Sequence, residues 1–406
     1  MPQLTDLESS WLALFWERQR LQWLTYAEHR VVDLQALDAR QLDLAERIAA
    51  LPVTDRRSRV LRLSALRDTI DLQPAVCSLR NRLDSPEPGD EVRSPQEAAL
   101  QARSDVLHLM ELRSGAAQRA GFPSYPEAVL FCEEIPLPWL RGRLLDILDT
   151  YLPEAFHLAK SHQLALPSWF RQLDGFMPAP ALSDPHALWN ALLRCLGLPA
   201  HLREPRTLLH EGGIAGYAAA LHVPDDIRLL ARPPRTLAQW ITLLHELCHA
   251  VAFRSCTADG VFATWTPAEA EVAAVMLEQV ATPLLLEEPW RGEAARIQLL
   301  EGVRCCISML FELDLWENQE HPEALYTHWY SQLTATIGGP VSWACDSFRS
   351  IDPMCVFAYA LGYAFGREQA GHGRAGSTLV REFSAPGRSR PILDRLAAAS
   401  GHGLEQ

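Results

Sequence analysis

The stretch Thr242–Val251, T-L-L-H-E-L-C-H-A-V, decides how this 406-residue chain is interpreted. It places His245 and His249 four residues apart, so on a helix both imidazoles lie on the same face. Two histidines at this spacing, with Glu246 directly after the first, form the pattern in which the histidines bind zinc and the glutamate acts as general base. The other residues of the stretch are uncharged, which predicts a buried helix whose polar groups need partners. We therefore expect a metal ion at His245 and His249.

Helix-capping signals surround this stretch. Thr236-x-x-Gln239 has the form of a capping box, which predicts that the motif helix begins there. A second helix is predicted after a turn-rich segment. It starts at Thr266 as N-cap, with Pro267 in the first helical position.

The segment before the motif helix differs from the rest of the chain. Between residues 206 and 232, Gly212-Gly213 precedes I-A-G-Y-A-A-A-L-H-V, and a turn at Pro224-Asp225-Asp226 leads into I-R-L-L-A-R. This pattern predicts a β-hairpin. Residues 213–222 either present a sheet edge to which an extended peptide adds as a strand or form an ordinary buried hairpin.

A catalytic zinc usually has three protein ligands, with a fourth position for water. The second helix offers Glu269, Glu271 and Glu278. Glu269 lies three residues after Thr266 and has a role in its capping box. Glu278 shares the face of Glu271 seven residues on and is able to hold the N–H of a ligating histidine, or it is a surface carboxylate.

The amino-acid composition limits which partners and which cellular setting we expect for this protein. The net charge of −13 makes nucleic acid an unfavourable partner and offers no attraction to an acidic membrane surface. No run of about 18 apolar residues predicts a membrane span. The nine cysteines, with Cys305 and Cys306 adjacent, make a poor disulfide framework. Together with an N-terminus unlike a secretory signal, they predict a reduced, cytoplasmic setting.

Most of the chain has helical periodicity, with residues 5 to about 50 as one helical stretch. The segment S-P-E-P-G-D-E-V-R-S-P (85–95) is the best candidate linker. We therefore divide the chain into an N-terminal helical region, residues 1–94, and a catalytic region, residues 95–406.

Several segments match one family in the same order. H-E-L-C-H (245–249) is followed by A-E-V-A-A-V-M-L-E (270–278). Weaker matches are L-M-E-L-R-S-G-A-A-Q-R-A-G-F-P-S-Y (109–125), F-A-Y-A-L-G (357–362) and the tail E-F-S-A-P-G-R-S-R-P-I-L-D-R-L (382–396). In these segments, which span about residues 100–406, the chain resembles the M3-type zinc metallopeptidases, that is, the oligoendopeptidase F and thimet oligopeptidase-like family. It is shorter than typical members.

The resemblance implies a mainly α, two-lobed helical gluzincin metallopeptidase fold with a small antiparallel sheet next to the motif helix. It also implies one Zn²⁺ per chain. In the family, a glutamate at the position of Glu271 is the third metal ligand, and another follows at the position of Glu278. Ala274 stands where the family usually has serine.

The family stabilises the oxyanion with a histidine and tyrosines from the C-terminal region, and here the chain departs from it. S-F-R-S-I-D-P-M-C-V-F-A-Y (347–359) has no histidine and only Tyr359. Tyr359 and Tyr363 are the nearest candidate donors, or else they are core aromatic residues. More distant candidates are His328, Tyr326, Tyr330 and Arg349.

These observations predict a zinc-dependent hydrolase that cleaves short peptides, with Glu246 as general base. One alternative is a repurposed enzyme that acts on an amide or other group in a small-molecule or peptide natural-product pathway. Another is a non-catalytic binding protein with the same fold, although zinc binding alone does not require the Glu246 carboxylate.

Overall fold

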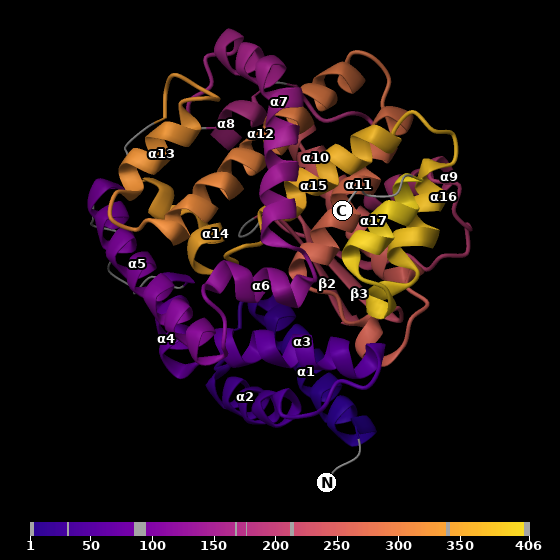
Figure 1. The fold of residues 1–406 in the computed structure, drawn as a ribbon. Helices are drawn as coiled ribbons and strands as arrows, with labels where there is room; N and C mark the ends of the chain where they lie inside the picture. Colours follow the sequence, from indigo (N-terminus) through magenta and orange to yellow (C-terminus); the bar gives the residue numbers. More distant parts are fainter. Residues whose placement is uncertain are drawn as a thin grey trace.

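The computed structural model describes residues 4–30, 32–84, 95–166, 169–175, 177–211, 215–337 and 342–401. Gly212-Gly213 and the candidate linker, except for Pro95, lie outside these ranges, so the predicted boundary at 94/95 stays a prediction. The described chain is mainly helical with one small sheet, as predicted (Figure 1). None of its helices is long and apolar enough to cross a membrane.

Nine helices precede the sheet, and eight follow it in the described ranges. The first group is α1 (Leu4–Glu28), α2 (Gln35–Ala49), α3 (Arg56–Asp71), α4 (Pro74–Asp84), α5 (Pro95–Arg119), α6 (Tyr125–Glu133), α7 (Leu137–Ser161), α8 (Trp169–Asp174) and α9 (Pro185–Cys195). The second group is α10 (Leu237–Ser255), α11 (Pro267–Leu285), α12 (Trp290–Glu317), α13 (Pro322–Tyr330), α14 (Ser347–Ser350), α15 (Phe357–Gln369), α16 (Ala375–Leu379) and α17 (Ile392–Ser400).

The single helix predicted over residues 5–50 is wrong, because the chain breaks between α1 and α2. His29 adopts a left-handed φ of 51°, which a helix does not tolerate. The backbone N–H of Arg30 donates to the carbonyl of Leu24, 3.2 Å away, and the chain then turns. The two helices, together with α3, enclose a small hydrophobic core of their own that includes Trp11, Leu44 and Leu61.

The sheet contains the predicted hairpin and one further strand. Strand β2 (Gly216–His222) pairs antiparallel with β3 (Asp226–Ala231), and β1 (Arg206–Leu209) pairs parallel with the other side of β3. The sheet is therefore mixed, where a purely antiparallel one was expected. A four-residue strand whose side chains are mostly exposed leaves little alternation to detect in sequence. The strand order β1-β3-β2 makes β2 an edge strand.

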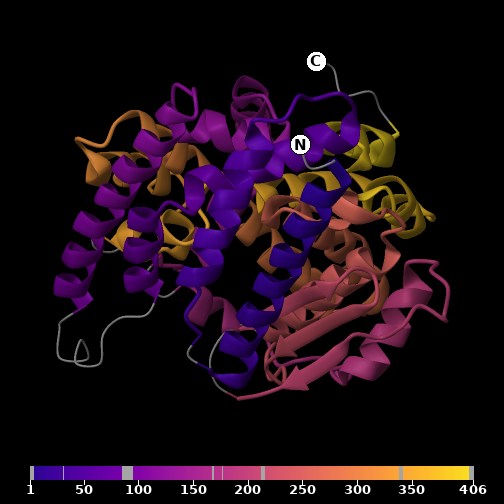
Figure 2. The same ribbon diagram turned by 90° about the horizontal axis from the view of Figure 1, so that it is seen from below.

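Both faces of the sheet are covered. Ile227 and Leu229 of β3 face the main core, whereas Leu230 faces the other side, as the period of two in a strand requires. On that other side, Leu230 packs with Trp23 of α1, which crosses the sheet in Figure 2. The main core contains residues of α10, α11, α12 and α15 and holds the motif helix in the interior.

Both predicted caps are present, with one difference in detail. Thr266 and Glu269 form the reciprocal capping box at α11, and Pro267 is in its first turn. At α10, the Thr236 hydroxyl accepts from the Gln239 N–H at 3.2 Å. The Gln239 side chain, however, accepts from the N–H of the residue before Thr236, at 2.9 Å. The helix start is thus confirmed, and only the reciprocal bond is displaced.

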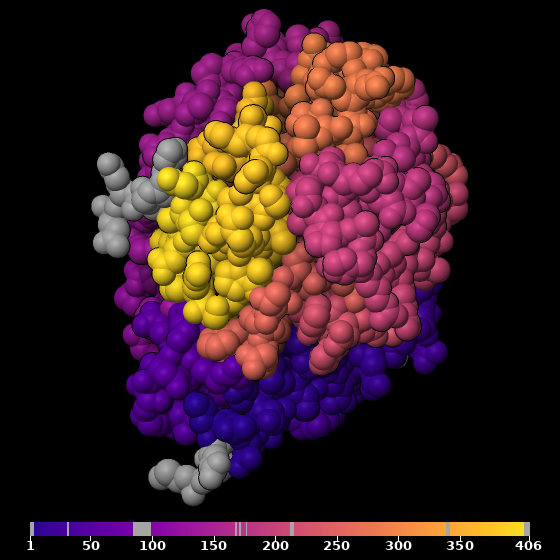
Figure 3. Space-filling view, turned by 90° about the vertical axis from the view of Figure 1, so that its right-hand side faces the viewer, coloured from indigo at the N-terminus to yellow at the C-terminus, as the bar shows by residue number. Residues whose placement is uncertain are grey.

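The C-terminal segment, which contains α16 and α17, covers part of the surface of the molecule. In Figure 3 it lies beside the segment that contains α9 and above the N-terminal helices. The approach is close at Gly376, where a Cβ atom would lie 2.6 Å from Cδ2 of Leu196. Arg388 and Arg395 from this segment both pair with the carboxylate of Glu269. The first turn of α11 is thereby fixed to the end of the chain.

Candidate metal centre

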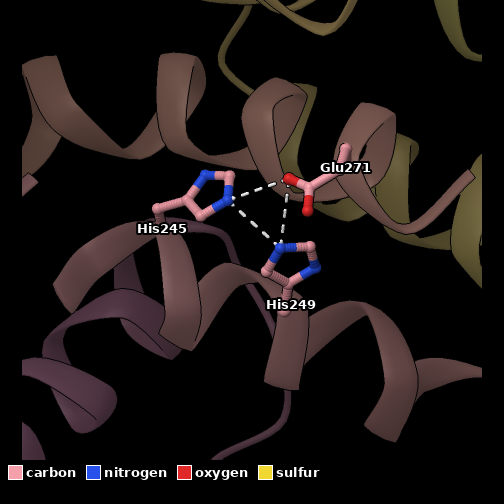
Figure 4. Close-up of side chains that lie close together, drawn as sticks. All are labelled: His245, His249 and Glu271. Atoms are coloured by element: carbon pink, nitrogen blue, oxygen red, sulfur yellow. Dashed lines mark hydrogen bonds and ion pairs between the residues drawn. The ribbon is translucent and has the colours of Figure 1, made fainter. Parts of the chain in front are cut away.

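Helices α10 and α11 bring three of the predicted residues to one point. Nε2 of His245 lies 3.1 Å from Oε2 of Glu271 and 3.1 Å from Nε2 of His249 (Figure 4). The third distance, from Nε2 of His249 to Oε2 of Glu271, is 3.4 Å. The ligand atoms of the three side chains lie within 4.8 Å of one another, and they form the one such group found among the described residues.

The contact made by Nδ1 of His245 indicates which ring nitrogen is available to a metal ion. Its Nδ1 lies 3.1 Å from Oε2 of Glu278. Because a carboxylate accepts, Nδ1 carries a hydrogen, and Nε2 is the nitrogen that can face a metal ion beside Glu271 once it has lost its own proton. Glu278 thus lies where the sequence analysis expected it, on the face of Glu271 and against the N–H of a candidate ligand.

The carboxylate of Glu278 is itself held in place. Gln298, from α12, donates through Nε2 to Oε1 of Glu278 at 2.7 Å and to Oγ1 of Thr282 at 2.9 Å. Gln298 carries no signal in the sequence for this contact, because it follows Glu278 by 20 residues on another helix and no local pattern connects them.

His249 is positioned differently from His245. Its Nδ1 is buried and has no hydrogen-bond partner among the described residues. The ring instead stacks against Phe253, one turn further along α10, with centroids 5.9 Å apart and planes inclined by 18°. On the Nδ1 side, packing against Phe253 therefore helps to orient this imidazole, whereas Nε2 faces His245 and Glu271.

The charges around the three ligand atoms favour a cation between them. Burial alone would lower the pKa of His245, but hydrogen bonds and charge interactions with Glu271 and Glu278 outweigh it and raise the pKa. Burial alone would raise the pKa of Glu271, but His249 and His245 outweigh it and lower the pKa well below its usual range. Two imidazole nitrogens and one carboxylate oxygen are a ligand set that zinc takes in catalytic sites with one open position.

Glu246 points from α10 toward the sheet. Burial raises its pKa, and this effect is partly offset by His249, by His245 and by the nearby backbone of Ala218. The same carboxylate lies directly against Gly216 at the start of β2. The sequence analysis identified this segment as a hairpin but did not connect it to Glu246.

Glu269 is not part of the group of converging side chains, because its carboxylate is bonded to other residues. Its Oε2 accepts from the backbone N–H of Thr266 at 3.1 Å and pairs with Nε of Arg388 at 3.3 Å. Its Oε1 pairs with Arg395. The structural role predicted for Glu269 is therefore present, and the paired arginines reinforce it.

The two candidate tyrosines of α15 have different surroundings. The ring of Tyr359 stacks on His245, with centroids 6.1 Å apart and planes at 16°, and burial together with the nearby Glu271 carboxylate raises the pKa of its hydroxyl. The hydroxyl of Tyr363 instead accepts from Nη1 of Arg367 at 2.8 Å. Its ring lies against Gly302 of α12. Tyr359 is thus beside the candidate metal ligands, and Tyr363 is in the core.

The four more distant candidates lie elsewhere. Arg349 is buried and pairs with Glu312 at 2.6 Å. Tyr330 is buried beside Arg349, the Tyr326 hydroxyl donates to a backbone carbonyl at 3.3 Å, and His328 is exposed. Within the part of the chain that is described, none of these four contacts the three ligand side chains.

Comparison with known proteins adds information on the fold. No protein-family model matches the sequence, and no curated protein matches it. Among solved structures, an M32 carboxypeptidase from Deinococcus radiodurans R1 superposes with a TM-score of 0.69 at 14% identity, covering 99% of this chain and 96% of the other. A carboxypeptidase from Pyrococcus furiosus gives 0.63 at 14% identity, covering 99% and 95%.

A structure from the family suggested by the sequence is also similar. A putative oligoendopeptidase F from Bacillus anthracis str. Ames has a TM-score of 0.57 at 14% identity, covering 98% of this chain and 80% of the other. This chain is therefore shorter than the oligoendopeptidase, as predicted, but nearly as long as the two carboxypeptidases. The chain has the helical fold that these metallopeptidases share.

Proposed function

We propose that this protein is a zinc-dependent peptidase that hydrolyses short peptides. The observation that carries the proposal is the convergence of Nε2 of His245, Nε2 of His249 and Oε2 of Glu271, with the Glu246 carboxylate in the next position of the same helix. A structural zinc site is usually closed by four protein ligands, whereas three leave a position for water or substrate.

Each residue of the site has a role in this reaction. Zinc, when bound, polarises a carbonyl and lowers the pKa of water. Glu246 accepts the proton of the attacking water and passes it to the leaving amine, a role that a carboxylate with a raised pKa suits. Tyr359 is the donor nearest to the ligands and stabilises the oxyanion. The edge strand β2 receives the substrate as an added strand, since no further strand covers it in the described sheet.

Removal of residues from the C-terminus of a peptide substrate is a second candidate function, and it uses the same chemistry. It is favoured by the closer superposition on the carboxypeptidase from Deinococcus radiodurans R1, at a TM-score of 0.69 against 0.57 for the oligoendopeptidase. The near-complete coverage of the carboxypeptidase chain, 96%, points the same way.

One experiment tests the function and separates the two candidates. Zinc-loaded protein is incubated with peptide libraries that have free or amidated C-termini, and the products are identified by mass spectrometry. A carboxypeptidase removes single residues from free C-termini only, whereas an oligopeptidase cleaves internally in both libraries. Stoichiometric zinc without cleavage would favour the repurposed enzyme or the binding protein. Absence of zinc from the purified protein would contradict every enzymatic interpretation.

Replacing Tyr359 by phenylalanine tests the oxyanion donor. We expect kcat to fall by about 10²- to 10³-fold, because the hydroxyl that stabilises developing charge is lost. Tyr363→Phe is the matched control on the same helix, and its kcat should stay close to that of the wild type. Steady-state kinetics on one cleaved peptide, with zinc content measured for each variant, checks this. Equal losses in the two variants would assign the effect to core packing.

Replacing Glu278 by glutamine tests the support of His245. We expect zinc affinity to fall by about 10- to 100-fold, because the charged acceptor for the His245 N–H is lost. The exposed Glu287, changed to glutamine, is the control for loss of one negative charge. Competition with a chromophoric chelator measures both dissociation constants. Unchanged affinity in Glu278→Gln would show that His245 needs no carboxylate.

A further inference from the structure

The start of strand β2 touches the candidate general base at a residue without a side chain. A Cβ atom built on Gly216 would lie 2.6 Å from Oε1, 2.7 Å from Cγ and 2.9 Å from Cδ of Glu246. These distances are shorter than carbon atoms in contact allow, which is about 3.5 Å or more. The volume that a side chain at 216 would fill is therefore occupied by the Glu246 carboxylate.

Backbone conformation does not explain the glycine. The φ angle of Gly216 lies outside the left-handed region in which L-residues are strained. The residue begins a regular antiparallel pairing, opposite Ala231 of β3. Glycine weakens a strand interior because it loses more conformational freedom on folding than other residues. Alanine would thus suit the strand better, and contact with Glu246 is the identified obstacle.

The surroundings of the Glu246 side chain leave it little room to move. Glu246 is only 7% exposed, and the backbone of Ala218, two residues along β2, also lies near enough to its carboxylate to lower the pKa. The carboxylate is therefore confined against the strand mainly by packing.

We propose that Gly216 is a positioning residue, whose missing side chain lets the Glu246 carboxylate lie against the face of β2 that is turned toward α10. The proposal rests on the function proposed above, in which Glu246 is the general base. The same strand then contacts the base on one face and offers its open edge to the substrate. A peptide added along β2 therefore lies close to the base that α10 supplies.

The variant Gly216→Ala tests the proposal. The added methyl group displaces the carboxylate, and a misplacement of about 1 Å costs on the order of 10²-fold in rate. We expect kcat to fall by about this factor while KM and the zinc content stay at wild-type values. Gly142→Ala is the control, because a Cβ atom at Gly142 meets nothing within 4 Å. Wild-type kcat in Gly216→Ala would overturn the proposal.

A thermal double-mutant cycle tests the contact without any assay of activity. Gly216→Ala should lower Tm when Glu246 is present and should leave it unchanged, or raise it, in the Glu246→Ala background, because the three clashing atoms are then absent. The same loss of Tm in both backgrounds would show that the clash involves something else and would overturn the proposal. If the wild type cleaves no peptide, the proposed function fails, but this cycle still decides whether Gly216 positions Glu246.

Discussion

Replacing Glu246 by glutamine should lower kcat for peptide cleavage by about 10²- to 10⁴-fold, the range in which a positioned general base contributes. Glutamine keeps the size of the side chain, so it fills the same space against Gly216. It cannot take the proton of the attacking water. The change therefore removes one chemical step and preserves the shape of the site.

Zinc content separates this loss of chemistry from a loss of structure. Glu246 is not among the three side chains whose ligand atoms converge, so Glu246→Gln should bind as much zinc as the wild type. Kinetics and metal analysis on the same preparation check both expectations. Cleavage that persists at the wild-type rate would assign the base to another group. A wild type that binds zinc but is as inactive as the variant would favour the non-catalytic binding protein.

The convergence of the three candidate ligands could be predicted from sequence because its signals are local. His245, Glu246 and His249 lie within one helical turn and a half, and capping residues mark where each helix begins. The capping box also separated Glu269 from Glu271, although these residues are only two positions apart. The face shared by Glu271 and Glu278 likewise follows from the period of the helix.

The surroundings of the site could not be predicted, because they depend on contacts between distant segments. Gln298 reaches Glu278 from another helix, and Gly216 meets Glu246 from the sheet. Tyr359 and Tyr363 share one face of α15 by their spacing, so sequence alone treats them equally. The packing of α15 distinguishes them, since one ring stacks on His245 and the other lies against α12.

The remaining errors arise from weak local signals. A short exposed strand such as β1 has almost no alternation of apolar and polar residues. Its parallel pairing with β3 is a property of the whole sheet. The break after α1 depends on one left-handed residue, His29, for which histidine is not a strong signal. Local propensity is overridden at both places by the way the elements pack.

Replacing Glu271 by glutamine should remove zinc binding and, with it, activity. Two of the three converging ligands would remain, and the amide is a poorer ligand than the carboxylate whose pKa the two histidines lower. For the wild type, zinc at about 1,000 times its Kd should add about 4 kcal/mol to the free energy of unfolding. For Glu271→Gln, the same zinc concentration should leave Tm unchanged. Thermal unfolding with and without zinc, after treatment with a chelator, measures both.

The neighbouring carboxylate on the same helix supplies the control that makes this result specific. Glu269→Gln removes the charge that pairs with Arg388 and Arg395. Loss of one partner from a buried ion pair costs about 3–5 kcal/mol, so Tm should fall while the zinc-dependent increase in Tm remains. The two variants should thus separate by their response to zinc: Glu271→Gln loses the zinc-dependent increase in Tm, whereas Glu269→Gln keeps it at a lower starting Tm. If both variants lost the response to zinc, Glu271 would be acting through the packing of α11 and not as a ligand.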